Sequence, residues 1–113
     1  MFLTHRERVY ASIYEPDSID RPPVALWRHF PVDDQDPNAL SAATVAYQKF
    51  YDWDLVKVTP ASSFCLKDWG TTDAWEGNAE GTRRITRYVI KKPQAWEKLL
   101  VLDPRKSKHL EAQ

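Results

Sequence analysis

The stretches PVALWRH (residues 23–29) and DLVKVTP (residues 54–60) are two apolar runs that each end in polar side chains. Between them, apolar residues recur at three- and four-residue steps from Leu40 to Tyr51, as expected for an amphipathic helix. The pattern predicts a strand, a helix and a second strand, and a connection of about 25 residues suits a right-handed parallel crossover. Since such a unit usually belongs to a larger sheet, the sequence predicts an α/β fold.

The flanking segments predict shorter elements. Thr4 and Glu7 have the spacing of a capping box, which predicts a helix that Pro16 ends. Asp36-Pro37 predicts the start of the central helix. Residues 61–81 are irregular, whereas residues 82–90 alternate and predict a strand that forms a hairpin with part of residues 61–70. Short helices are expected at 93–99 and 106–113.

Composition favours a globular protein without a nucleic-acid or membrane partner. The 113 residues are 42% hydrophobic and contain 16 basic and 16 acidic side chains, so no long-range field attracts polyanions. Cys65 is the only cysteine and has no internal disulfide partner. Together with the lack of a signal-like or membrane-spanning apolar stretch, this predicts a cytoplasmic location. The three histidines lack ligand neighbours at metal-binding spacing, so no metal is expected.

The polar ends of the two predicted strands form the candidate binding site. Alternation places Arg28 with Leu26 and Lys57 with Leu55, so both cations are expected to face the same side and receive an anion. His29 and Thr59 lie at the same strand ends, where parallel sheets hold their ligands. The alternatives are that Lys57 is an edge residue or pairs with an aspartate, and that His29 is a packing residue.

The order of several sequence pieces resembles the amino-terminal part of the uroporphyrinogen decarboxylase family. The pieces are Glu7-Arg8-Val9, Asp20-Arg21-Pro22-Pro23-Val24 followed by Arg28, the run at 54–60, residues 87–99 and Leu102-Asp103-Pro104. The resemblance implies a (β/α)8 or TIM barrel, of which residues 1–113 would form an amino-terminal fragment with the first βαβ unit, a short hairpin and helices. A closed barrel needs roughly 250 residues.

The resemblance also implies a lyase of porphyrin biosynthesis that decarboxylates a tetrapyrrole without a cofactor. Arg28 matches the family's first substrate arginine, and a guanidinium suits carboxylates. The chain departs from the family at His29-Phe30-Pro31, where an arginine-rich loop is expected, and at Thr59-Pro60-Ala61, where an essential aspartate is expected.

We therefore expect a decarboxylase-like fragment that is inactive alone, whose catalytic residues are not identified. The expected partners are a polycarboxylate such as a tetrapyrrole and either a second copy or a complementary barrel fragment, because an incomplete sheet leaves an unpaired edge. The alternatives are part of a corrinoid-dependent methyltransferase and a noncatalytic binding module.

Overall fold

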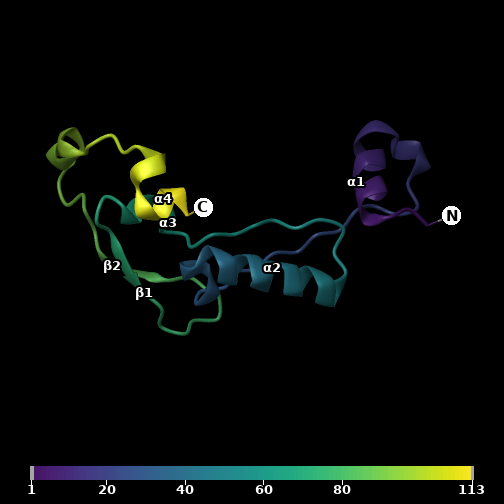
Figure 1. Cartoon of the computed structure of the whole chain (residues 1–113), viewed down its shortest axis with the longest axis horizontal. Helices are drawn as coiled ribbons and strands as arrows, with labels where there is room; N and C mark the ends of the chain where they lie inside the picture. Colours follow the sequence, from purple (N-terminus) through teal and green to yellow (C-terminus); the bar gives the residue numbers. More distant parts are fainter. Residues whose placement is uncertain (1, 113) are drawn as a thin grey trace. The chain divides into compact units, whose positions relative to one another are not determined.

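A computed structural model describes residues 2–112, which divide into two compact units (Figure 1). Unit 1 consists of residues 2–28 and 41–58, and unit 2 of residues 29–40 and 59–112. The two apolar runs contribute residues 24–28 and 54–58 to unit 1. The hairpin and the short carboxyl-terminal helices belong to unit 2.

The first helix of unit 1 forms as the sequence predicts. Helix α1 (His5–Tyr14) is capped by Thr4, whose side chain accepts a hydrogen bond from the backbone N–H of Glu7, while the Glu7 carboxylate accepts one from the backbone N–H of Thr4. This reciprocal pair satisfies two amides that a helix start leaves without partners. The helix ends before the 3-10 turn η1 (Pro16–Ser18), which confirms the role of Pro16.

Helix α2 (Pro37–Tyr51) confirms the predicted central helix. The Asp36 side chain accepts a hydrogen bond from the backbone N–H of Ala39 at 2.9 Å, and proline occupies the first helical position. The helix ends at Asp52, which adopts a left-handed backbone conformation with φ 57°. Aspartate and asparagine tolerate that conformation better than most residues with a side chain.

The prediction of an α/β fold with the first βαβ unit of a (β/α)8 barrel is wrong. Residues 24–28 and 54–58 form no strands, the second run begins with a bend at residues 54 and 55, and residues 2–112 contain no parallel strand pair. One backbone hydrogen bond, from Asp54 N to the Val24 oxygen at 2.9 Å, joins the starts of the two runs. Parallel strands need further strands at their edges and helices on both faces, and a lone pair of strands is marginally stable.

The sheet in the described residues is a two-stranded antiparallel hairpin of β1 (Thr72–Ala74) and β2 (Arg84–Arg87). The strand predicted at 82–90 is therefore confirmed in its centre. Its expected partner was wrong, because the pairing segment follows residues 61–70. The Asn78 side chain closes the connecting loop through hydrogen bonds to the backbone N–H and oxygen of Thr82.

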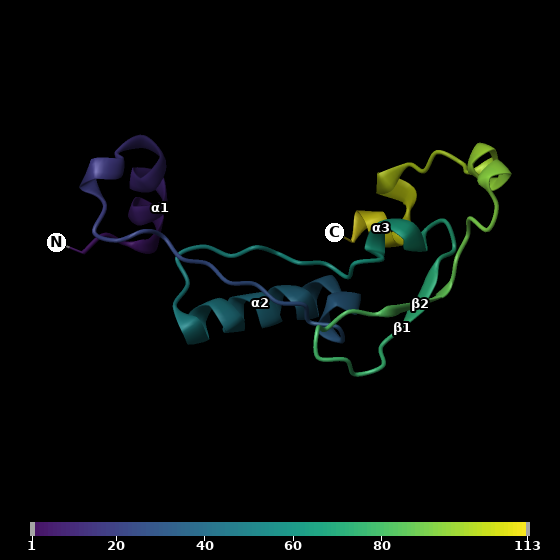
Figure 2. The ribbon, with the colours of Figure 1, turned by 180° about the vertical axis from the view of Figure 1, so that it is seen from behind.

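Short helices form the rest of unit 2, and Figure 2 shows them from the opposite side to Figure 1. The short helix predicted to begin at Pro93 is present as a 3-10 helix, and the terminal helix is also present, although both are shorter than expected. The elements are η2 (Asp33–Gln35), α3 (Phe64–Lys67), η3 (Pro93–Lys98), η4 (Pro104–Lys106) and α4 (Lys108–Glu111).

The buried interior is unusually polar. Among the described residues, the hydrophobic ones that are buried are Leu40 and Ala61, and both belong to unit 2. In residues 2–28 and 41–58, which form unit 1, burial is confined to Arg8, Thr44 and Asp54. Since apolar burial is the main favourable term in folding, unit 1 depends on its polar contacts to hold its shape.

Candidate functional site

The carboxylate of Asp54 is the most connected group in unit 1. Its side chain is 1% exposed. One oxygen accepts from His5 Nδ1 at 2.8 Å and from Arg8 and Arg21, and the other accepts from Arg21 and from the backbone N–H of Val24 at 2.8 Å. These contacts bring together the start of α1, the connector before the first apolar run and the start of the second run.

Arg8 joins Asp54 to a second carboxylate, that of Asp20. The Nε and Nη2 atoms of Arg8 donate to the two oxygens of Asp20 at 2.8 and 2.9 Å, which is the strong two-pronged geometry. Nη2 of Arg8 also donates to the Leu3 backbone oxygen at 2.7 Å, so little of this guanidinium faces solvent. We name His5, Arg8, Asp20, Arg21 and Asp54 the Asp54 network.

The Asp54 network keeps both carboxylates ionised. Hydrogen bonds from Arg8 hold the pKa of Asp20 well below its usual range. Burial alone would raise the pKa of Asp54, but hydrogen bonds from Arg21, His5, Val24 and Arg8 outweigh burial and lower that pKa strongly. A general acid at neutral pH needs a raised pKa instead. The oxygens are also occupied by donors, so the network is a structural tie with no free acid or base.

Unit 2 contains a second buried carboxylate, that of Asp73 on β1. It accepts hydrogen bonds from the Ser63 hydroxyl and from Arg83 Nε at 2.7 Å, and Lys67 Nζ lies 3.6 Å away. Burial would raise the pKa of Asp73, but the hydrogen bonds from Ser63 and Arg83 outweigh burial and lower it. Ser63 is held by a carboxylate and not by an imidazole, so this cluster is no hydrolase-type nucleophile and base.

Asp68 and His109 form a third polar pair in unit 2. Asp68 accepts from His109 Nδ1 at 2.9 Å and from the backbone N–H groups of His109 and Leu110. His109 and Lys67 also line a cavity of about 70 Å³ beside the buried Asp34. That volume has room for about two water molecules, so the cavity does not fit the tetrapyrrole that the sequence predicts.

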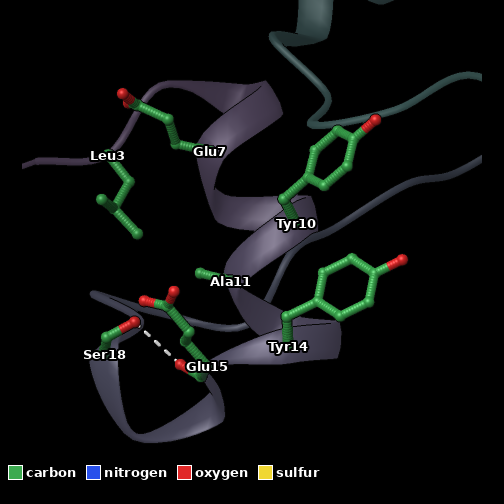
Figure 3. Close-up of a pocket in the computed structure, with 7 residues that line it drawn as sticks. All are labelled: Leu3, Glu7, Tyr10, Ala11, Tyr14, Glu15 and Ser18. Carbon is green, nitrogen blue, oxygen red and sulfur yellow. Dashed lines mark hydrogen bonds between the residues drawn. The ribbon is translucent and has the colours of Figure 1, made fainter.

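A larger hollow of about 370 Å³ lies along α1 in unit 1 (Figure 3). Tyr10 and Tyr14 extend from the same side of the helix, with their ring centroids 6.2 Å apart. Glu7 also lines the hollow, but its carboxylate is held in the capping box, and hydrogen bonds from Thr4 lower its pKa. The lining contains no lysine, arginine, histidine or cysteine. Its residues are Leu3, Glu7, Tyr10, Ala11, Tyr14, Glu15 and Ser18.

Arg28 and Lys57 both lie in unit 1 and are exposed. The Lys57 ammonium lies 3.8 Å from the centre of the Trp27 ring, a cation–π contact. Lys57 thus contacts an aromatic side chain of the first run. Because the runs are not strands, alternation no longer supports a shared face for Arg28 and Lys57. Their anion site stays a prediction.

His29 and Thr59 both lie in unit 2. His29 is half-buried, and a Cβ placed on Gly81 would stand 3.0 Å from the His29 Cβ. Gly81 also has a φ of 71°, so both the close approach and the backbone conformation favour glycine at this position. Thr59 is 8% exposed. The role of the His29 ring stays a prediction.

The sequence gives one signal for the Asp54 network that the prediction did not use. An aspartate opens the apolar run at 54–60, and two further charged residues, Asp20 and Arg21, precede the first run. A carboxylate next to a buried run needs cationic partners. That rule points to arginines such as Arg8, but spacing alone does not identify which ones.

A cluster of metal ligands and a membrane-spanning helix were sought in residues 2–112. No group of three or more His, Cys, Asp or Glu side chains there is arranged to hold a metal ion. None of the helices described is both long enough and apolar enough to cross a membrane.

Comparison with protein-family models, curated proteins and solved structures finds no match to this chain. The resemblance to the uroporphyrinogen decarboxylase family therefore stays a prediction from the sequence.

Proposed function

We propose that this chain is part of a carboxy-lyase of the uroporphyrinogen decarboxylase type, that it is inactive alone, and that it works in association with a second polypeptide. The second polypeptide is either a second copy of this chain or a complementary barrel fragment. The observation that carries the proposal is the exposed apolar surface of residues 24–28 and 54–58, next to Arg28 and Lys57. A cytoplasmic location, with Cys65 as a free thiol, is part of the proposal.

Six apolar side chains of the two runs are exposed. Leu26 is 57% exposed and Val58 is 60% exposed. Neighbouring residues in the same runs are also apolar and do not cover them. Exposed patches of this kind mark sites where another protein binds. The other exposed apolar side chains of the two runs are Val24, Trp27, Leu55 and Val56.

The two runs are also held in a constant register. The hydrogen bond from Asp54 to Val24 and the contact of Lys57 with Trp27 have the same sequence offset. Both views show the runs following the same direction beside α2 (Figures 1 and 2). Backbone at the exposed edge of a strand accepts an added strand readily. This register supports association along the edges of the runs.

Binding of a polycarboxylate tests the ligand part of the proposal. We expect uroporphyrin to bind the associated chain and Arg28→Ala to weaken that binding about tenfold, because a charge-assisted contact to a carboxylate contributes about 1.5 kcal/mol or more. Arg105→Ala is the matched control, since the Arg105 side chain is 89% exposed and belongs to unit 2. Equal losses for the two variants, or no binding by the unmodified chain, contradict the proposal.

An anaerobic assay with uroporphyrinogen tests the reaction. The purified chain should produce no more coproporphyrinogen than a heat-killed control, because Thr59-Pro60-Ala61 stands where the family has its aspartate. Turnover by the purified chain would show that the missing aspartate is not needed.

A noncatalytic binding module is the second candidate. It is favoured by the state of Asp20, Asp54 and Asp73, whose oxygens are occupied by donors and whose pKa values are lowered. Uroporphyrin binding with no turnover after association with any partner would favour this module.

A further inference from the structure

An apolar groove of about 290 Å³ lies in unit 2. Its lining contains three aromatic side chains, four aliphatic ones and one threonine hydroxyl. We name it the aromatic groove, and its residues are Leu66, Trp69, Thr71, Tyr88, Val89, Ile90, Trp96 and Leu99. A mostly apolar hollow with few polar groups is typical of a small-molecule site, and this volume lies at the small end for such sites.

The aromatic side chains of the groove are available to a ligand. Tyr88 is 62% exposed and Trp96 is 65% exposed, so their rings are not used in a core. Trp69 is oriented by a hydrogen bond from its Nε1 to the Leu100 oxygen at 2.8 Å. That bond fixes the indole plane and satisfies its polar atom. A flat aromatic molecule would gain area and ring contacts here with little side-chain ordering.

The exposed charged residues that neighbour the lining in the chain are mainly basic, with Glu97 after Trp96 as the acidic exception. Residues 81–96 contain five Lys and Arg side chains and no Asp or Glu. Two of the five are paired outside the groove, Arg83 with Asp73 and Arg84 with Glu76. The other three are exposed, and two of them are next to the lining residues Tyr88 and Ile90 in the chain. They are Arg87, Lys91 and Lys92.

We propose that the aromatic groove binds a small aromatic anion, with one or two fused rings and one carboxylate or sulfonate group. The rings contact Trp69, Tyr88 and Trp96, and the anionic group faces Arg87, Lys91 or Lys92. The site is independent of Arg28, so it goes beyond the proposed function and fails separately from it.

Titration of the full chain with 2-naphthoate, monitored through the indole N–H signals in NMR spectra, tests the proposal. We expect the signals of Trp69 and Trp96 to shift with saturation, while that of Trp75, which does not line the groove, stays unchanged. The neutral analogue 2-naphthalenemethanol should bind several-fold more weakly, since it lacks the charge-assisted contact. Equal affinity of the two compounds, shifts at every tryptophan, or no shift overturns the proposal.

Variants that remove charge distinguish a specific anion site from nonspecific hydrophobic binding. The double variant Lys91→Gln, Lys92→Gln should weaken 2-naphthoate binding about tenfold and leave the neutral analogue unchanged. Lys106→Gln, whose side chain is 84% exposed, is the matched control. If a second copy of the chain fills the groove, naphthoate will not shift the two indoles at any concentration, which also overturns the proposal.

Discussion

Asp54 in unit 1 and Asp73 in unit 2 are both buried aspartates, but they organise very different amounts of chain. Asp54 accepts from α1, from the connector at Arg21 and from the start of the first apolar run, all more than 29 residues away in sequence. Asp73 accepts from Ser63 and Arg83, each 10 residues away. Asp54 therefore ties distant segments together, whereas Asp73 fastens a local hairpin.

The surroundings of the two aspartates sharpen this difference. Unit 2 buries Leu40 and Ala61 as well as polar groups, while the buried residues described in unit 1 are Arg8, Thr44 and Asp54. A buried ion pair gives little net stability, but breaking one leaves a charge without its partner. Unit 1 is thus held in shape by the Asp54 network.

Asp54→Asn should have the largest effect. The amide cannot accept from two arginines and His5 as a carboxylate does, so we expect unit 1 to lose about 3 kcal/mol. Hydrogen exchange resolved by unit would show faster exchange in residues 2–28 and 41–58. Asp52→Asn is the control, because the Asp52 side chain is 81% exposed and asparagine keeps the left-handed backbone. Similar exchange in both variants contradicts the role of Asp54.

Asp73→Asn should have a smaller effect, confined to unit 2. Arg83 also donates to the Pro31 oxygen at 2.7 Å, so it keeps one partner, and we expect a loss of about 1 to 2 kcal/mol. Hydrogen exchange in the hairpin measures it. Glu76→Gln, which removes an exposed pair with Arg84, should change exchange little. A loss as large as that of Asp54→Asn would remove the contrast between the two aspartates.

The smallest predicted effect is the pH dependence of unit 1. His5 contacts Asp54 through Nδ1 and Asp52 through Nε2, so both nitrogens donate only when the ring is protonated. Hydrogen bonds to Asp54 and then Asp52 raise the pKa of His5 above 6.5. Its contribution is therefore complete below pH 6.5 and is lost as the pH rises through the raised pKa.

The carboxylates of Asp20 and Asp54 set the lower pH limit of the stability of unit 1. The lowered pKa values of Asp20 and Asp54 mean that their contribution is present above the usual value of 3.8 and is lost as the pH falls below it. NMR titration of His5 checks the upper limit, and Asp52→Asn should lower the pKa that it measures. A His5 pKa of 6.5 or less in the unmodified chain would contradict the bridge between the two carboxylates.

Helices were predictable from this sequence because their signals are local. The Thr4–Glu7 capping box and the Asp36-Pro37 start fix α1 and α2 within a few residues of chain. The apolar runs at 24–29 and 54–59 carry strand signals too, but strands need partners that lie outside the run itself. With one cross-run backbone hydrogen bond described, Val24 and Asp54 meet without forming a ladder.

The candidate site was less predictable for the same reason. The pairing of Arg8 with both Asp20 and Asp54 depends on how three distant segments meet, which no short pattern records. Lys57 contacts Trp27 at a register position that alternation within single strands does not give. The aromatic groove likewise combines residues from 66 to 99.

Sedimentation velocity of the purified chain, combined with thermal unfolding between about 1 and 50 micromolar, tests the central claim that the apolar runs require a second polypeptide. The account predicts association that increases over this range and an unfolding midpoint that rises with concentration. Replacing Leu26 and Val58 with serine should reduce the association, because both side chains lie on the exposed runs. A monomer that unfolds cooperatively, with the same midpoint at every concentration, would contradict the claim.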